Sequence, residues 1–119
     1  MSVVVIGASN KPDRYSYQAV KLLGEKGHTV FPVHQRVEYI DGITVYRSVR
    51  DIGEPVDTIT LYVNAGISDK IADDMLNMNV RRIIFNPGAE NSVLGEKARE
   101  RNIIAINACT LVLLRTGQF

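Results

Sequence analysis

Short apolar runs alternate with segments of helical spacing along most of the chain. Continuous runs rich in β-branched residues, such as residues 3–6, are typical of strands that are buried on both faces. Apolar residues three and four positions apart, such as Ala19, Leu22 and Leu23, indicate amphipathic helices between these runs. We expect strands at 3–6, 29–33, 58–63, 82–85 and 103–106, and helices at 15–26, 68–79, 92–101 and 111–114.

This alternation predicts an α/β fold, a doubly wound parallel five-stranded sheet with helices on both faces. Right-handed crossovers leave few topologies, and we expect the strand order 3-2-1-4-5. Pro32 is unfavourable within a central strand and suggests that the second strand ends there. Residues 36–52 interrupt the alternation: Asp41-Gly42 is a turn signal, and Ser48 with Asp51 has the spacing of a capping box.

Composition excludes several classes of protein. The chain has 119 residues, a formal charge of +1 and one cysteine, so we expect a single domain over residues 1–119 without an internal disulfide or a metal site. The nearly balanced charge argues against a general nucleic-acid binder. No apolar stretch is long enough to span a bilayer, and residues 1–7 lack the features of a signal peptide. A cytoplasmic protein with no nucleic-acid or membrane partner is the expectation.

The loop after the first strand combines features that suit a phosphate or pyrophosphate. In the expected strand order the ligand crevice lies at the carboxyl ends of the first and fourth strands, where the order reverses. Gly7 permits a tight turn, and the N-terminus of the following helix presents free N–H groups. The loop adds two hydroxyls and two cations, from Ser9, Ser16, Lys11 and Arg14. The alternative is that Asp13 or Ser16 only caps the helix and that both cations are solvated.

This loop is not the dinucleotide fingerprint. Ser9 and Pro12 stand where G-x-G-x-x-G requires its second and third glycines. The second strand ends in Val33-His34-Gln35-Arg36, without the acid that would hold an unphosphorylated ribose. Arg36 favours a ribose that carries a phosphate, as in NADP and coenzyme A (CoA), or it is an ordinary exposed charge.

The loop after the fourth strand, Asn86-Pro87-Gly88-Ala89-Glu90-Asn91, is rich in turn formers. Asn86 and Asn91 could hydrogen-bond a ligand, and Glu90 is the only candidate general base in this loop. We favour a structural role, in which Asn91 or Ser92 caps the next helix. Neither histidine has a partner that suggests a triad, and a lone Cys109 is more often a small buried hydrophobe. We therefore predict no catalytic residue.

A family resemblance emerges from two segments taken together. Gly7-Ala8-Ser9-x-x-Pro12-x-Arg14-Tyr15-Ser16-Tyr17 is followed by Gly27-His28-x-Val30-x-Pro32-Val33. In these segments the chain resembles the small stand-alone CoA-binding domain proteins, which are similar to the N-terminal domain of the succinyl-CoA synthetase α subunit. It departs from the usual Val-Asn-Pro with Val33-His34-Gln35, and from the usual aromatic-Leu-Gln-x-Gly with Phe85-Asn86-Pro87-Gly88.

The resemblance implies a Rossmann-like fold and a binding site for CoA. The first loop would hold the pyrophosphate, the end of the second strand would lie near the adenosine and its 3′-phosphate, and the loops after the third and fourth strands would line the rest of the groove. The cofactor-binding residues expected in this way are Gly7, Ala8, Ser9, Asn10, Lys11, Arg14, Ser16, Tyr17, Val33, His34, Gln35, Arg36, Tyr62, Val63, Asn64, Asn86, Pro87 and Gly88.

The expected function is therefore the non-catalytic binding of CoA or an acyl-CoA by a binding or regulatory module. In the larger synthetases the catalytic histidine belongs to a second domain, which this chain does not contain. Two alternatives stay open: a small enzyme that uses NADP or another nucleotide, and a protein-interaction module with a vestigial groove. The sequence leaves open whether the chain forms a homo-oligomer or binds a protein partner.

Overall fold

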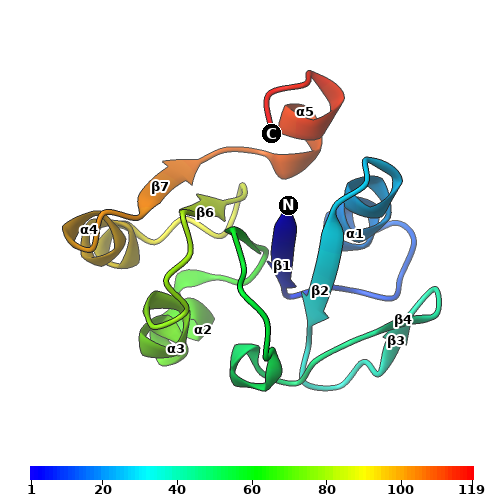
Figure 1. Ribbon diagram of the computed structural model, residues 1–119, viewed down its shortest axis with the longest axis horizontal. Helices are drawn as coiled ribbons and strands as arrows, with labels where there is room; N and C mark the ends of the chain where they lie inside the picture. The colour runs from blue at the N-terminus through cyan, green and yellow to red at the C-terminus, as the bar shows by residue number, and fades with distance from the viewer.

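A computed structural model describes residues 1–119 and shows a five-stranded parallel sheet with helices on both faces (Figure 1). The fold class is that of the Rossmann-like α/β proteins, as the sequence predicts. The elements in chain order are β1 Ser2–Ile6, α1 Tyr15–Glu25, β2 Thr29–Val33, β3 Tyr39–Ile40, β4 Ile43–Thr44, the 3₁₀ helix η1 Val49–Asp51, β5 Thr58–Leu61, α2 Ala65–Lys70, α3 Ala72–Leu76, β6 Arg82–Phe85, α4 Ser92–Glu100, β7 Ile104–Asn107 and α5 Thr110–Arg115.

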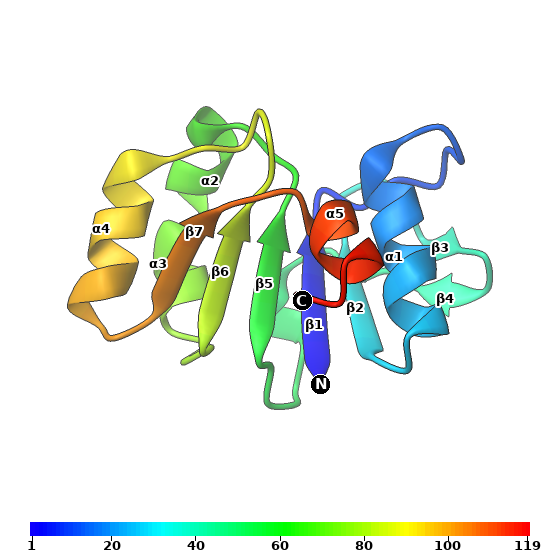
Figure 2. The ribbon, with the colours of Figure 1, turned by 90° about the horizontal axis from the view of Figure 1, so that it is seen from above.

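The strand residues divide between two apolar layers by their alternation along the chain. Val3 and Val5 face α1 and α5, where they join Leu23 and other buried side chains. Val4 and Ile6 face the opposite side, which is covered by η1, α2, α3 and α4. Figure 1 shows α1 and α5 on one side of the sheet and α2 and α3 on the other, and Figure 2 shows the sheet face-on with α5 in front of it. Because β1 is buried on both faces, its residues are apolar without alternation, as the sequence pattern indicates.

The order of the sheet is β2-β1-β5-β6-β7. Counted over these five strands in chain order it reads 2-1-3-4-5, so the third strand, β5, pairs with β1 and not with β2 as in the expected 3-2-1-4-5 order. Pro32 gives the physical reason. Its carbonyl accepts from Tyr46 N at 2.8 Å on the outer side of β2, so its ring nitrogen, which has no proton, faces the same outer side. A full strand paired on that side would lack one ladder hydrogen bond at Pro32. This favours β2 as the edge strand of the sheet.

The region expected as one helix over residues 68–79 forms two short helices, α2 and α3. The side chain of Asn64 accepts from Ile67 N at 3.0 Å, and this cap starts α2 at residue 65. At Ile71 the N–H bonds to the carbonyl of Ser68, three residues back, which ends α2 before α3 begins. No helix of the chain is both long enough and apolar enough to cross a membrane.

The segment between β2 and β5 forms a small hairpin and one helical turn, as its turn and capping signals predict. Asp41 and Gly42 both have positive φ angles at the tip of β3–β4. The Tyr17 hydroxyl of α1 donates to Asp41, and Lys21 Nζ lies 3.1 Å from the same carboxylate. These contacts hold the hairpin beside α1, and the hydrogen bonds from Tyr17 and then Lys21 hold the pKa of Asp41 below its usual value.

Gly7 marks a close approach between the chain after β1 and the chain after β5. Its φ is +86°, and a Cβ there would lie 2.8 Å from Val63 Cγ1 and 3.2 Å from the carbonyl carbon of Tyr62. Only glycine takes this backbone conformation without strain, and no side chain fits the space. The two loops at the carboxyl edge can therefore meet only because residue 7 is glycine.

Replacing Gly7 by alanine should lower the free energy of unfolding by at least about 1–3 kcal/mol, the usual cost of a strained backbone conformation. Urea unfolding measures the change. Gly24→Ala is the matched control, because Gly24 lies within α1 with nothing near its Cβ position and without a positive φ. That control should be neutral or stabilising. Equal stability of Gly7→Ala and the wild type would contradict the close approach.

At the amino ends of the strands, Asp57 joins the starts of β5 and β6. Arg81 holds this carboxylate with two hydrogen bonds of 3.0 and 3.1 Å, and these bonds, more than the one from the Thr58 hydroxyl, lower the pKa of Asp57. A lowered pKa in the folded state stabilises the fold above the ordinary carboxyl pKa, and that stability is lost as pH falls through the folded value.

Asp57→Asn should therefore reduce the free energy of unfolding by up to about 1 kcal/mol at pH 7 and pH 5. The difference from wild type should shrink by pH 3, as measured by urea unfolding at the three pH values. Glu54→Gln, an exposed carboxylate without an ion pair, serves as the control. A difference that is the same at pH 3 and pH 7 would argue against the ion pair.

Candidate functional site

Two cavities flank the carboxyl end of β1. The first, here called the α1-side cavity, has a volume of about 800 Å³ and is enclosed mainly by the loop between β1 and α1. Tyr62, Pro87, His34 and Val37 complete it from the loops after β5, β6 and β2. The cavity therefore lies at the edge where ligands bind in open parallel sheets.

The second, here called the α2-side cavity, has a volume of about 450 Å³. Residues 33–36 form one wall, residues 47–49 at the start of η1 form another, and residues 63–71 at α2 form the third. Gly7 and His34 line both cavities. The two cavities thus adjoin across the end of β1, so that a single elongated ligand can reach both.

The N-terminus of α1 is open toward the α1-side cavity. Its N-cap residue is Arg14, whose side chain makes no capping hydrogen bond, and the first backbone bond runs from Gln18 N to Arg14 O. Neither Asp13 nor Ser16 caps the helix, as the alternative interpretation of this loop proposed. The N–H groups of residues 15–17 have no acceptor within the helix, and with Lys11 and Arg14 nearby they suit an anion.

His34 stands between the cavities in a defined tautomer. Its Nδ1 accepts a hydrogen bond of 2.9 Å from Arg36 N. In the neutral ring the proton is therefore on Nε2, which makes that nitrogen a donor. His34 does not contact a serine, cysteine or carboxylate through Nδ1, so it is not arranged as the base of a triad.

Tyr62 lines the α1-side cavity, but its hydroxyl oxygen is shielded from solvent. The oxygen is buried and has no hydrogen-bond partner within the protein. Burial raises the pKa of this phenol to about 12, so it is neutral at physiological pH. The hydroxyl lies near the Thr60 and Thr110 side chains inside the protein, so it is not a contact for a ligand in the cavity.

The basic side chains of both cavities are free of ion pairs. The ion pairs of the structure are Lys21–Asp41, Arg50–Asp74 and Arg81–Asp57. None of these cations lines either cavity. Asp13 is the one carboxylate in the α1-side cavity, and the α2-side cavity has none. Both sites therefore carry positive charge that a phosphorylated ligand can neutralise.

Most residues expected from the sequence lie together around these cavities. The α1-side cavity contains Gly7, Ala8, Ser9, Asn10, Lys11, Arg14, Ser16, His34, Tyr62 and Pro87. The α2-side cavity contains Gly7, Val33, His34, Gln35, Arg36 and Val63.

Four expected residues line neither cavity, because other parts of the protein use them. Tyr17 donates to Asp41, Asn64 caps α2, and Gly88 N donates to Glu90 Oε1 at 2.9 Å. Asn86 is buried: its Nδ2 donates to Thr60 Oγ1 at 2.7 Å and to Leu61 O at 2.9 Å, and its Oδ1 accepts from Thr110 N at 2.8 Å. This asparagine therefore ties the ends of β5, β6 and the start of α5 together.

The position of β5 also changes which loops face the crevice. With the order 2-1-3-4-5 the reversal lies between β1 and β5, and not between the first and fourth strands. Tyr62 and Val63 after β5 therefore adjoin the first loop directly, whereas the loop after β6 reaches the site only through Pro87. Asn91 caps α4 by accepting from Leu94 N at 3.1 Å, in agreement with the structural interpretation of that loop.

The sequence did not reveal the part of the α2-side cavity formed by Arg47, Ser48, Ile67, Lys70 and Ile71. One signal pointed there: Ser48 has a capping pattern, and its Oγ accepts from Arg50 N at 3.1 Å at the start of η1. Nothing in the sequence places Lys70 on the same cavity as Arg36, because that depends on the position of α2 across the sheet.

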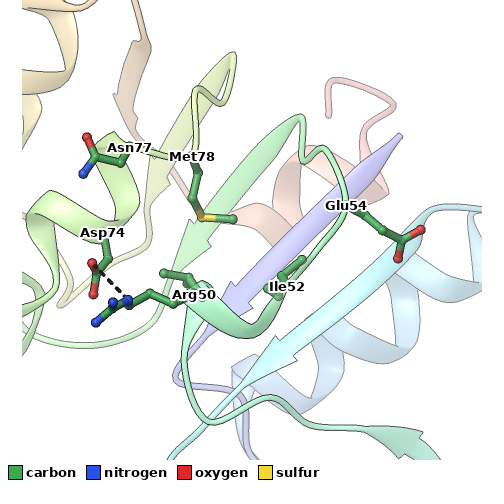
Figure 3. Close-up of a pocket in the computed structure, with 7 residues that line it drawn as sticks. Arg50, Ile52, Glu54, Asp74, Asn77 and Met78 are labelled. Carbon is green, nitrogen blue, oxygen red and sulfur yellow. Dashed lines mark ion pairs between the residues drawn. The ribbon is translucent and has the colours of Figure 1, made fainter.

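A third cavity, of about 530 Å³, lies between η1 and α3 (Figure 3). Arg50 and Asp74 face each other across it at 4.0 Å, and both side chains are more than a third exposed to solvent. Asn77 and Met78 lie on the segment that leads into the start of β6, so this cavity opens away from the carboxyl edge. An exposed ion pair at this distance contributes little, and the cavity brings together no set of unpaired cations.

Comparison with known proteins identifies the family. A family model described as CoA binding domain matches residues 1–115. A 62-residue stretch is 40% identical to the α subunit of ADP-forming acetate–CoA ligase II from Pyrococcus furiosus, and the match covers 51% of this chain and 14% of that subunit. The ADP-forming acetate–CoA ligase of Methanocaldococcus jannaschii is 25% identical over 124 aligned residues, which cover 97% of this chain and 18% of the ligase.

The chain thus spans less than a fifth of either ligase. The crystal structure of an uncharacterized protein has the same fold, with a TM-score of 0.94, 36% sequence identity, and coverage of 99% of this chain and 97% of the other. Because the family model covers nearly the whole chain, this protein belongs to the CoA-binding domain family.

Proposed function

We propose that residues 1–119 act as one unit that binds coenzyme A or an acyl-CoA without transforming it. The pyrophosphate would lie in the α1-side cavity, and the adenosine with its 3′-phosphate would lie in the α2-side cavity. The observation that carries this proposal is the adjacency of two cation-lined cavities that share Gly7 and His34. The family supports CoA as the ligand, because its model is that of a CoA-binding domain.

The α1-side cavity suits the pyrophosphate because it combines three kinds of donor. The uncapped N-terminus of α1 offers backbone N–H groups, Lys11 and Arg14 offer charge, and Ser9 and Ser16 offer hydroxyls. Helix N-termini attract anions through both their free donors and their dipole.

The α2-side cavity suits the adenosine because its walls are apolar and its rim is basic. Val33, Val63, Ile67 and Ile71 provide the apolar surface that a purine ring contacts. Arg36 follows β2 at the place where dinucleotide-binding sheets carry an acid for an unmodified ribose. Arginine at this place favours a ribose that bears a phosphate.

Binding without catalysis is proposed because neither cavity contains a paired nucleophile and base. Cys109 lines neither cavity, Glu90 is occupied by Gly88 N, and His34 Nδ1 is occupied by Arg36 N. The chain matches less than a fifth of each acetate–CoA ligase, so only CoA binding, and not the ligase reaction, is proposed for it. We further propose that the protein acts in the cytoplasm on a small-molecule ligand.

CoA at 100 times its dissociation constant should stabilise the protein by about 2.7 kcal/mol, which thermal denaturation detects as a higher Tm. Arg14→Gln should weaken CoA binding about tenfold in titration calorimetry, because it removes a charge-assisted hydrogen bond to a phosphate. Arg115→Gln, at an exposed residue of α5 that lines neither cavity, should leave affinity unchanged.

The proposal fails if CoA, acetyl-CoA and dephospho-CoA all leave the Tm unchanged at millimolar concentration. A rise in Tm with NADP but not with CoA would favour the alternative of a small NADP-using enzyme. Unchanged affinity of Arg14→Gln would remove Arg14 from the site while leaving the CoA ligand in place.

A further inference from the structure

Three cations from three separate elements meet around the α2-side cavity. Arg36 follows β2, Arg47 lies between β4 and η1, and Lys70 is the last residue of α2. Arg47 and Lys70 are not among the residues expected from the sequence. Their convergence on one cavity is a product of the fold, since they are 23 positions apart.

The charge of this cavity is not neutralised by the protein. None of the three cations forms an ion pair, and no carboxylate lines the cavity. The α1-side cavity is different, because Asp13 stands there beside Lys11 and Arg14. The three side chains are exposed, so water screens their mutual repulsion, and an anion bound among them would be attracted by all three.

The excess charge corresponds to the chemistry of a phosphomonoester. Such a group carries about −1.5 to −2 charges at neutral pH, whereas each bridging phosphate of a pyrophosphate carries one. The more basic α2-side cavity therefore matches a terminal phosphate on the ribose. Its apolar walls, formed in part by Val33 and Ile67, suit the attached purine.

The backbone on both sides of Arg47 is held in place. Tyr46 N donates to Pro32 O at 2.8 Å, and His34 N donates to Tyr46 O at 2.9 Å, so residue 46 is bound to the edge of β2. On the other side, Ser48 caps η1. The position from which the Arg47 side chain reaches the cavity is thus set before any ligand arrives.

Lys70 is held in a comparable way through α2. Asn64 caps the start of this helix, and within it the buried Ser68 accepts a hydrogen bond of 2.8 Å from Asn91 Nδ2. A cation in the last turn also complements the helix dipole, but that effect does not require a cavity or neighbouring cations. The shared cavity with Arg36 and Arg47 is what distinguishes Lys70 from an ordinary helix-terminal lysine.

We propose that Arg47 and Lys70, with Arg36, form a phosphate clamp that makes the protein select an adenosine whose ribose carries a phosphomonoester. This inference rests on the proposed CoA-binding function and adds its specificity. This group, a phosphomonoester on the ribose, is present as the 3′-phosphate of CoA and as the 2′-phosphate of NADP. The ligands without that group are dephospho-CoA and NAD.

The test is titration calorimetry of these four ligands with the wild type, Arg47→Gln, Lys70→Gln and the double variant. Wild type should bind CoA far more tightly than dephospho-CoA. Each single variant should reduce CoA affinity roughly tenfold, because each loses one charge-assisted contact, and should leave dephospho-CoA affinity unchanged. Arg50→Gln is the control, since Arg50 lies three residues from Arg47 but lines only the third cavity.

The outcomes separate the two proposals. Binding of CoA and dephospho-CoA by wild type, with the same affinity ratio in the double variant, overturns the clamp and leaves CoA binding intact. An equal loss for both ligands also overturns it, since Arg47 and Lys70 would then contact something other than the ribose phosphate. If wild type binds NADP over NAD and neither CoA form, the clamp stands and the proposed CoA function falls. No binding of any of the four ligands ends both.

Discussion

The close approach at Gly7 is the constraint on which the rest of the site depends. β5 pairs directly with β1, so the loops that follow these two strands start next to each other at the carboxyl edge of the sheet. A side chain at residue 7 would collide with Val63, and its absence lets the two loops lie in contact. Gly7 consequently lines both cavities, which adjoin at the end of β1.

Basic side chains gather around the two cavities at the carboxyl edge. Among the cations outside the two cavities, Arg81 pairs with Asp57 and Lys21 with Asp41. At the carboxyl edge the basic side chains stay unpaired, although the whole chain has a formal charge of only +1. Such a local excess of positive charge attracts anions, which agrees with the ligand proposed for a CoA-binding domain.

The sequence predicted the elements better than it predicted their arrangement. Buried strands and amphipathic helices have their own hydrophobic periods, and β2 was expected with the bounds that it has. The place of β5 was not foreseen, because Pro32 in the sequence suggests the end of the second strand, and only the structure shows that its nitrogen faces the outer side of an edge strand. Asn86 was expected at the ligand because it follows a strand end, but an amide there can equally satisfy neighbouring buried groups, which is what it does.

By itself, the sequence determined the fold class, the glycine and cations of the first loop, and the basic end of β2. These depend on contacts between residues close in the chain, where periodicity, turn chemistry and charge are readable. Only the tertiary structure decided that Tyr62 and Val63 adjoin the first loop and that Arg47 and Lys70 join Arg36. Those contacts depend on which strand β5 pairs with and where α2 packs, and many side-chain contacts distributed over the whole core set both.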